Sequence, residues 1–193
     1  MSLAVCAKVD LVLPMSKRMR RLLALDQASH TTGWSVFLDD KLEAWGHFDV
    51  DDEVIGERLH KIREKVAQLI ADYDINELAF EDIQLQNNVV NNVQTFKTLA
   101  EVFGVIWELA VMLEIPHTAV LAGTWKSTLG IAGKTRPEQK RNAQAFAQNR
   151  YGIKCTQDEA DSLCIGTHML IKHGLAKKPA TKTSVADEGF DWG

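Results

Sequence analysis

Four acidic residues stand at positions where a carboxylate is unfavourable unless something compensates its charge. Asp26 directly follows an apolar run that has the length of a buried strand, and Glu81 directly follows a second such run. Asp158 and Asp161 are three residues apart, so on a helix both project from one face. A charged group at the end of a buried strand is costly to desolvate, and like charges one helical turn apart repel each other.

A divalent cation would remove both conflicts. Two strand-end acids and a D-x-x-D pair supply the hard oxygen ligands that Mg²⁺ prefers. Two such ions about 4 Å apart can activate a water molecule and stabilise the leaving oxygen of a phosphodiester. Each acid alone fits an exposed strand end or a turn cap, since some of the 26 acidic residues must fall there by chance. The order of all four in the chain is what predicts a metal site.

A basic segment lies between the two pairs of acids in the sequence. From Thr124 to Lys154 the chain has seven Lys and Arg residues and one Glu, a net charge of +6. The whole chain has a net charge of −4, so the remainder is at −10. This asymmetry favours contact with a polyanion on one side of the molecule, although a solvated helix face has the same composition.

Apolar periodicity predicts the elements that must position these groups. The predicted strands are 22–28, 33–39, 42–48, 77–82 and 117–122, and the predicted helices are 51–72, 95–113, 137–150 and 157–173. A tight reversal at Asp39-Asp40 joins the second and third strands. Thr156 and Glu159 form the pattern of a capping box at the start of the last helix. The Asn-rich stretch 87–92 is expected in turns, and the Gly-containing stretch 123–136 in a loop.

The ends of the chain lack this periodicity. We expect a basic N-terminal extension at 1–20, one globular domain at 21–174 and a flexible tail at 175–193. No apolar run has the roughly 18 residues needed to span a bilayer, and the N-terminus lacks the pattern of a signal peptide. The three cysteines form no CxxC pair, so neither a zinc site nor a disulfide framework is expected. These features are typical of a cytoplasmic protein without a membrane partner.

Four blocks of sequence resemble a known family. They are "LLALDQASHTTGWSVF", "LAFEDIQLQNN", "TWKSTLGIAGKTRPEQKR" and "YGIKCTQDEADSLCIGTHML". In order and spacing they are similar to the RuvC-like Holliday junction resolvases of the ribonuclease H-like superfamily, especially the phage and prophage branch. The resemblance spans roughly residues 21–170. It implies an α/β fold with a five-stranded mixed sheet, its first three strands antiparallel, flanked by helices.

The resemblance also implies roles for individual residues. Asp26 matches the acid of the family's first strand, Glu81 that of the fourth strand, and Asp158 and Asp161 those of the last helix. Lys126 matches a basic residue near the scissile phosphate. Further phosphate contacts are expected from Lys134, Arg136, Lys140 and Arg141. Bacterial members have an aromatic residue shortly after the strand-four acid, where this chain has "DIQL", so base wedging by such a residue is not expected here.

The implied activity is that of a crossover junction endodeoxyribonuclease. It would bind two Mg²⁺ ions, with Mn²⁺ as an alternative, and resolve four-way DNA junctions by paired symmetric nicks. Two cuts across a symmetric junction require a two-fold homodimer, and the family forms it through the helix after the second acid. Two alternatives remain: another ribonuclease H-like nuclease acting on an RNA precursor or an RNA–DNA hybrid, and a catalytically silent junction-binding protein. A phosphotransferase of the actin-like ATPase group would need a second strand–Asp–Gly turn, which the sequence lacks.

Overall fold

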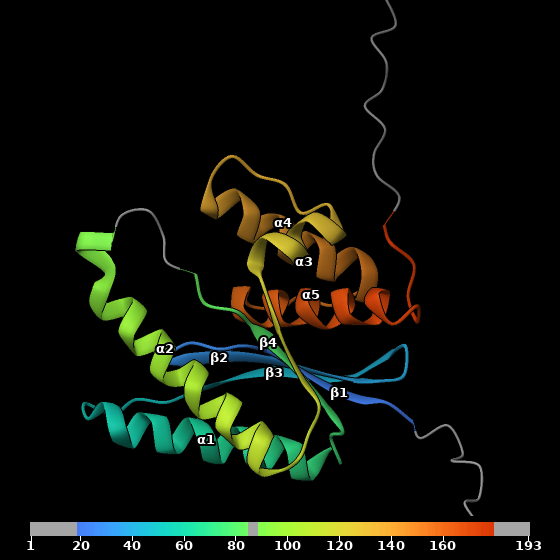
Figure 1. Ribbon diagram of the computed structural model, residues 1–193. Coiled ribbons are helices and arrows are strands. Elements are labelled where there is room, and N and C mark those ends of the chain that lie inside the picture. The colour runs from blue at the N-terminus through green and yellow to red at the C-terminus, as the bar shows by residue number, and fades with distance from the viewer. Residues whose placement is uncertain (1–18, 85–88, 180–193) are drawn as a thin grey trace, which may run out of the picture.

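The computed structural model describes residues 19–84 and 89–179, which form five strands and five helices (Figure 1). In chain order these are β1 (Arg21–Asp26), β2 (Thr31–Leu38), β3 (Lys41–Asp49), α1 (Ile55–Asp72), β4 (Glu77–Glu81), α2 (Val89–Met112), β5 (His117–Val120), α3 (Ala122–Leu129), α4 (Arg136–Tyr151) and α5 (Gln157–Lys172). No helix in this described part of the chain is long and apolar enough to cross a membrane.

The strands form one sheet in the order β3-β2-β1-β4-β5. β2 pairs antiparallel with β1 and β3, whereas β4 pairs parallel with β1 and β5. The predicted mixed sheet with three antiparallel strands first is therefore confirmed. The β2–β3 hairpin reverses at Asp39-Asp40, as predicted, and Asp39 adopts a φ of 51°, a left-handed conformation that Asp tolerates better than most residues.

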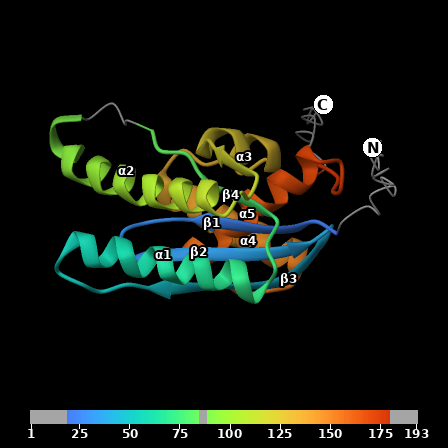
Figure 2. The ribbon, with the colours of Figure 1, turned by 60° about the horizontal axis from the view of Figure 1, so that its bottom comes forward.

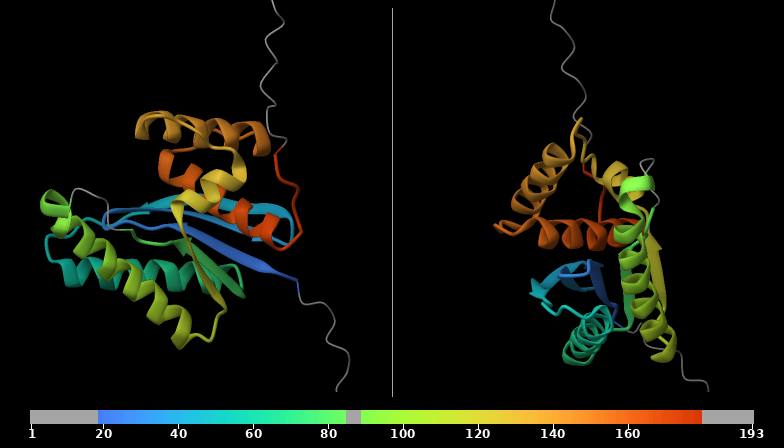
Figure 3. Two further views of the ribbon diagram at one scale, coloured as in Figure 1. Left: turned by 45° about the horizontal axis from the view of Figure 1, so that its top comes forward. Right: turned by 90° about the vertical axis from the view of Figure 1, so that its left-hand side faces the viewer.

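Helices cover both faces of the sheet. α1 and α2 lie side by side on one face (Figures 1 and 2), while α5 lies on the other with α4 stacked on it (Figure 3). Leu23 and Leu25 of β1 pack in the core beneath α1 and α2, and Leu22 and Ala24 pack in the core beneath α5. Because successive side chains of a strand point to opposite faces, this alternation decides which face each residue addresses.

α5 approaches the sheet closely because two glycines leave room for it. A Cβ atom at Gly33 of β2 would lie 2.0 Å from the carbonyl oxygen of Asp158. A Cβ atom at Gly166 of α5 would lie 2.1 Å from the ring of Phe37. Neither distance is sterically possible, so the seat of α5 on β2 depends on the absence of side chains at these two positions.

The last helix follows its prediction, and α1 departs from it at one end. Both hydrogen bonds of the predicted capping box, between Thr156 and Glu159, are present at the start of α5. α1 begins at Ile55 and not at residue 51. The side chain of Asp52 accepts the Val54 N–H at 2.9 Å, which forms a turn ahead of the helix.

Two other predictions are wrong. α2 begins at Val89, so the pair Asn91-Asn92 is helical and not part of a turn. Asn disfavours helix only weakly, and the length of α2 overrides it. The expected loop at 123–136 contains α3 in its first half. Gly130, which suggested a loop, has a φ of 67° and serves as the left-handed C-cap of that helix.

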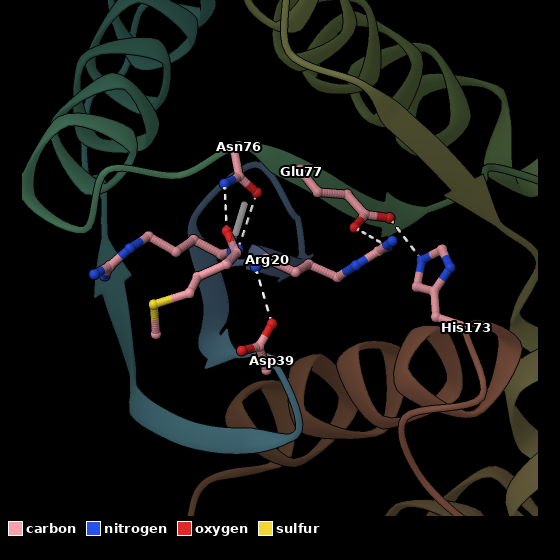
Figure 4. Close-up of polar contacts among 7 residues, drawn as sticks. Arg20, Asp39, Asn76, Glu77 and His173 are labelled. Atoms are coloured by element: carbon pink, nitrogen blue, oxygen red, sulfur yellow. Dashed lines mark hydrogen bonds and ion pairs between the residues drawn. The ribbon is translucent and has the colours of Figure 1, made fainter. Parts of the chain in front are cut away.

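A polar network ties together the sheet edge where β1 and β4 begin (Figure 4). The backbone N–H of Arg20 donates to Asp39 at 3.0 Å, and its guanidinium pairs with Glu77, the first residue of β4. His173, just past α5, bonds to the other oxygen of Glu77 at 2.8 Å. Asn76 accepts the backbone N–H of Arg21 at 2.9 Å. This network lies at the end of the sheet where β1 and β4 begin, opposite to the end where Asp26 and Glu81 lie.

The predicted ends of the chain fall mostly outside the described residues. Of the N-terminal extension only Met19 and Arg20 are described, and of the tail only 175–179. Asn87-Asn88, expected in a turn, also lies outside. The domain limits of 21–174 stay a prediction. Cys155 and Cys164 are free thiols.

Candidate active site

The ends of β1 and β4 bring two of the four acids together. The strands are parallel neighbours, with Ala24 opposite Ala79. Two residues further along, the same register sets Asp26 opposite Glu81. Strand alternation directs both carboxylates to the face of Ala24 and Ala79, which is the face that α5 covers.

The first turn and a half of α5 supplies the other two acids. Thr156 caps the helix, accepting the Glu159 N–H at 3.3 Å while Glu159 accepts the Thr156 N–H at 2.8 Å. Asp158 and Asp161 follow on one face of the helix and are half-buried. The N-terminal end of a helix favours negative charge, so α5 is a suitable support for both.

The four carboxylates line one cavity of about 190 Å³. Three basic side chains line it as well, Lys126 from α3 and Arg136 and Lys140 from α4. The uncharged residues Gln27, Ala28, Leu99 and Gln139 complete the lining. Acids from three elements and cations from two others therefore meet at one end of the sheet.

Two of the five predicted phosphate contacts do not line this cavity. Lys134 and Arg141 are exposed on α4 or just before it. The ammonium groups of the two lining lysines bond to neutral amides: Lys126 to Gln139 at 3.3 Å, and Lys140 to Gln157 at 2.7 Å. Among residues 19–84 and 89–179, no acid forms a salt bridge with any of the five basic residues. Their charges are therefore free to meet an anion.

Burial raises the pKa values of Asp26, Glu81 and Asp161, and for Asp26 and Asp161 the charges of neighbouring acids add to this effect. Burial, followed by the charge of Asp161, raises the pKa of Asp26 well above its ordinary value. Burial and the charge of Glu81 raise the pKa of Asp161 to about 7. Burial also raises the pKa of Glu81, against the opposing effects of a hydrogen bond from Trp125 and the Lys126 charge. Such shifts mean that the cluster binds protons, or another cation, more readily than isolated carboxylates do.

Solved structures with the same architecture include proteins that bind or resolve Holliday junctions. RuvC of Thermus thermophilus, in complex with Holliday junction substrate, superposes with a TM-score of 0.64 at 18% identity, covering 82% of this chain and 98% of that one. A second structure of Thermus thermophilus RuvC gives 0.61 at 19% identity, with 81% and 98% covered. The yeast mitochondrial Holliday junction resolvase Ydc2 gives 0.56 at 10% identity, with 81% and 80% covered.

The chain has the RuvC-type fold. The resemblance suggested by the four sequence blocks is thus confirmed at the level of architecture, and identities of 10–19% extend no further than that. No family model matches the sequence, and no curated protein does.

The chemistry of the donor set suits hard divalent cations. Four carboxylates offer oxygen ligands only, as Mg²⁺ and Mn²⁺ require. Within the described parts of the chain, however, no three His, Cys, Asp or Glu side chains are grouped tightly enough to hold an ion as they stand.

Two residues of the site have no counterpart in the sequence-based prediction. The side-chain amide of Gln27 forms two hydrogen bonds with the backbone of Glu81. It donates to the Glu81 carbonyl at 2.5 Å and accepts the Glu81 N–H at 3.1 Å. The indole of Trp125 donates to the carboxylate of Glu81 at 3.1 Å. A polar residue directly after the strand-end Asp26 was the one available signal for Gln27. Trp125 left no signal, because the stretch GTWKSTLG around it has the polar and glycine residues expected of a loop.

Proposed function

We propose that this chain is a divalent-metal-dependent endonuclease that resolves four-way DNA junctions by paired nicks. The observation that supports it is the cavity in which four carboxylates from β1, β4 and α5 meet Lys126, Arg136 and Lys140. Acids that attract cations lie next to Lys and Arg side chains that form no salt bridge within the described residues, and this combination suits a phosphodiester held beside metal ions. The proposed setting is DNA recombination or repair in the cytoplasm of a bacterium, or of the host of a phage.

The four acids have a common role in this proposal. Asp26, Glu81, Asp158 and Asp161 would hold two Mg²⁺ ions, with Mn²⁺ as a substitute. The bound ions would generate the attacking hydroxide and offset the negative charge that develops on the phosphate. Water then replaces the 3′ oxygen at phosphorus, which leaves a 5′-phosphate and a 3′-hydroxyl.

The basic residues would hold the substrate. Both Lys126 and Arg136 lower the pKa of Glu81 through their charges, and the effect of Lys126 is the larger, so Lys126 would meet the scissile phosphate. Arg136 and Lys140 would meet neighbouring phosphates, and the exposed Lys134 and Arg141 would extend this contact along the DNA backbone. Phosphate contacts of this kind orient the duplex without reading its sequence, and they make affinity fall with salt.

A homodimer is part of the proposal because one site makes one cut. The outer side of α2 exposes Trp107, Val111 and Met112 to 43%, 57% and 52%. Trp107 and Phe103, one turn before it, both pack edge-on against Phe80 of the sheet, with ring centroids 6.2 Å and 5.2 Å from that of Phe80. The exposed side chains near the end of α2 are apolar enough to bury against a second copy, which would give the two-fold symmetry of the junction.

The first test is cleavage of an end-labelled four-way junction and of a linear duplex with the same arm sequences. Each is incubated with Mg²⁺ or with EDTA, using the wild type, Asp26→Asn and Asp40→Asn. Asp40 lies in the β2–β3 turn and serves as a matched control for loss of one acid. We expect paired symmetric nicks in the junction from the wild type and Asp40→Asn, and none in EDTA or from Asp26→Asn.

The same assay separates the alternatives. Tight junction binding by the wild type without a cut in Mg²⁺ would favour the catalytically silent binder. Cuts confined to an RNA–DNA hybrid or a structured RNA, run as parallel substrates, would favour another ribonuclease H-like nuclease. Undiminished cutting by Asp26→Asn would refute the assignment of the cavity as the active site.

A further inference from the structure

Trp125 is a fully buried indole whose only polar atom faces a carboxylate of the cavity. Its side chain has 0% exposure and lies in the core beneath α5, near Leu129 and Ile131. The indole nitrogen can only donate a hydrogen bond. A buried N–H without an acceptor is energetically costly. It is satisfied by Glu81, whose Oε2 accepts it at 3.1 Å.

Glu81 is thereby held at both its backbone and its side chain. Gln27 pairs with its N–H and its carbonyl in the manner of a neighbouring strand. Trp125 occupies one carboxylate oxygen, and within the described residues no group donates to the other oxygen, Oε1. A carboxylate fixed in this way has one oxygen anchored to the core and one left for a ligand in the cavity.

We infer that Trp125 is a positioning residue that fixes Glu81 for cation binding. The inference rests on the proposed function, since it assigns a task to one of the four proposed metal-binding acids. Groups that hydrogen-bond a ligating carboxylate set its orientation, and their loss typically weakens metal affinity by about 10-fold to 100-fold. Free rotation of Glu81 would otherwise have to be restricted each time an ion binds.

Lys126, the next residue in the chain, has a different proposed role, so the effects of Lys126 and Trp125 can be measured separately. The ammonium group of Lys126 lies 5.0 Å from the centroid of the Trp125 ring and also lines the cavity. In the proposed function Lys126 meets phosphate, whereas Trp125 meets no part of the DNA because it is fully buried. Loss of the indole N–H should therefore change metal affinity and leave metal-free junction affinity unchanged.

The experiment measures Mn²⁺ binding to the full chain by calorimetry in the absence of DNA. The variants are Trp125→Phe and, as a control, Trp34→Phe. Trp34 is partly buried and packs against Tyr73 on the α1 side of the sheet, so its loss also removes a packed indole, but one without a contact to a carboxylate of the cavity. We expect Trp125→Phe to raise the Kd for Mn²⁺ about 10-fold and Trp34→Phe to change it less than twofold.

A second substitution guards against simple loss of packing. Incorporation of benzothienylalanine at position 125 replaces the indole N–H by sulfur and keeps the bicyclic shape. It should weaken Mn²⁺ binding as Trp125→Phe does. Junction affinity in EDTA, measured by anisotropy, should equal that of the wild type for both.

The outcomes distinguish two kinds of failure. Wild-type Mn²⁺ affinity in the benzothienylalanine protein would overturn the role of Trp125 and leave the proposed function standing. A wild-type chain that binds no Mn²⁺ and cuts no junction would overturn the proposed function and this role with it. Weaker Mn²⁺ binding together with weaker junction binding in EDTA would also refute the inference, since it would indicate general damage.

Discussion

At the scale of single residues, the buried acids should lower the stability of the metal-free fold when they are ionised. The pKa of Asp161 is raised to about 7 by burial and by Glu81, so its ionised form is unfavourable in the folded, metal-free chain. A raised folded-state pKa stabilises the fold at low pH, and this stability is lost as pH rises through that pKa. We expect the melting temperature of the wild type in EDTA to fall between about pH 4 and pH 8 for this reason.

Asp161→Asn removes that loss and should melt higher than the wild type in EDTA at pH 8. A gain of 1 kcal/mol corresponds to roughly 2–4 °C for a chain of this size. The two proteins should converge near pH 4, where the wild-type side chain is protonated. Scanning calorimetry across this pH range measures the effect, and Asp82→Asn, whose side chain does not line the cavity, is the control. Equal melting temperatures of the wild type and Asp161→Asn at pH 8 would contradict the expected destabilisation of the fold by ionised Asp161.

The acids were accessible from the sequence because each breaks a local rule. A carboxylate directly after a buried strand, as at Asp26, conflicts with the pattern around it, and such conflicts mark functional positions. Gln27 and Trp125 break no such rule. Their contacts with Glu81 join residues 54 and 44 positions apart, so they depend on how β1, β4 and α3 pack and not on any local pattern.

At the scale of elements, the close packing of α5 on β2 should affect the positions of the four acids more than any single side chain outside the cavity does. Gly33→Ala would place a methyl group 2.0 Å from the Asp158 carbonyl and force the start of α5 away from Asp26. Overpacking of this kind costs about 1–3 kcal/mol, and a displacement near 1 Å can cost about 100-fold in rate. Gly33→Ala should therefore lower both the melting temperature and junction cleavage.

Gly56→Ala is the matched control for that substitution. No atom lies within 4 Å of a Cβ built at Gly56 of α1, and alanine favours helix over glycine by roughly 1 kcal/mol. This variant should melt slightly higher than the wild type and cut at the wild-type rate, as measured by calorimetry and by the junction assay. Unimpaired cutting by Gly33→Ala would mean that the site tolerates movement of α5.

The sequence predicted elements best where periodicity and a cap coincide. α5 has both, through Thr156 and Glu159, and its limits were predicted within one residue. α3 is only eight residues long, too short to show a clear helical periodicity. Glycines occur both in loops and at helix ends, so the sequence did not distinguish a short helix from a loop here. Trp125 and Leu129 are the buried residues of this short helix, and they anchor it in the core.

At the scale of the whole molecule, the proposed function requires the acid-lined cavity and the apolar side of α2 to act in one reaction. A single site cuts one strand, while resolution of a junction requires two cuts in symmetric positions. Val111 is exposed to 57% on α2, and Val54, at the start of α1, is exposed to 59%. The two valines are thus matched in type and exposure, and only Val111 lies on the proposed interface.

Val111→Asp should convert a dimer into a monomer, because a buried unpaired charge at an interface is strongly unfavourable. Light scattering coupled to size exclusion would report the mass, with Val54→Asp remaining dimeric. The monomer keeps its four acids, so it should still bind Mn²⁺ while its paired cuts are replaced by slow, single, unpaired nicks. Paired cutting by a Val111→Asp protein that is monomeric at the assay concentration would show that symmetry of the cuts comes from the junction and not from the protein.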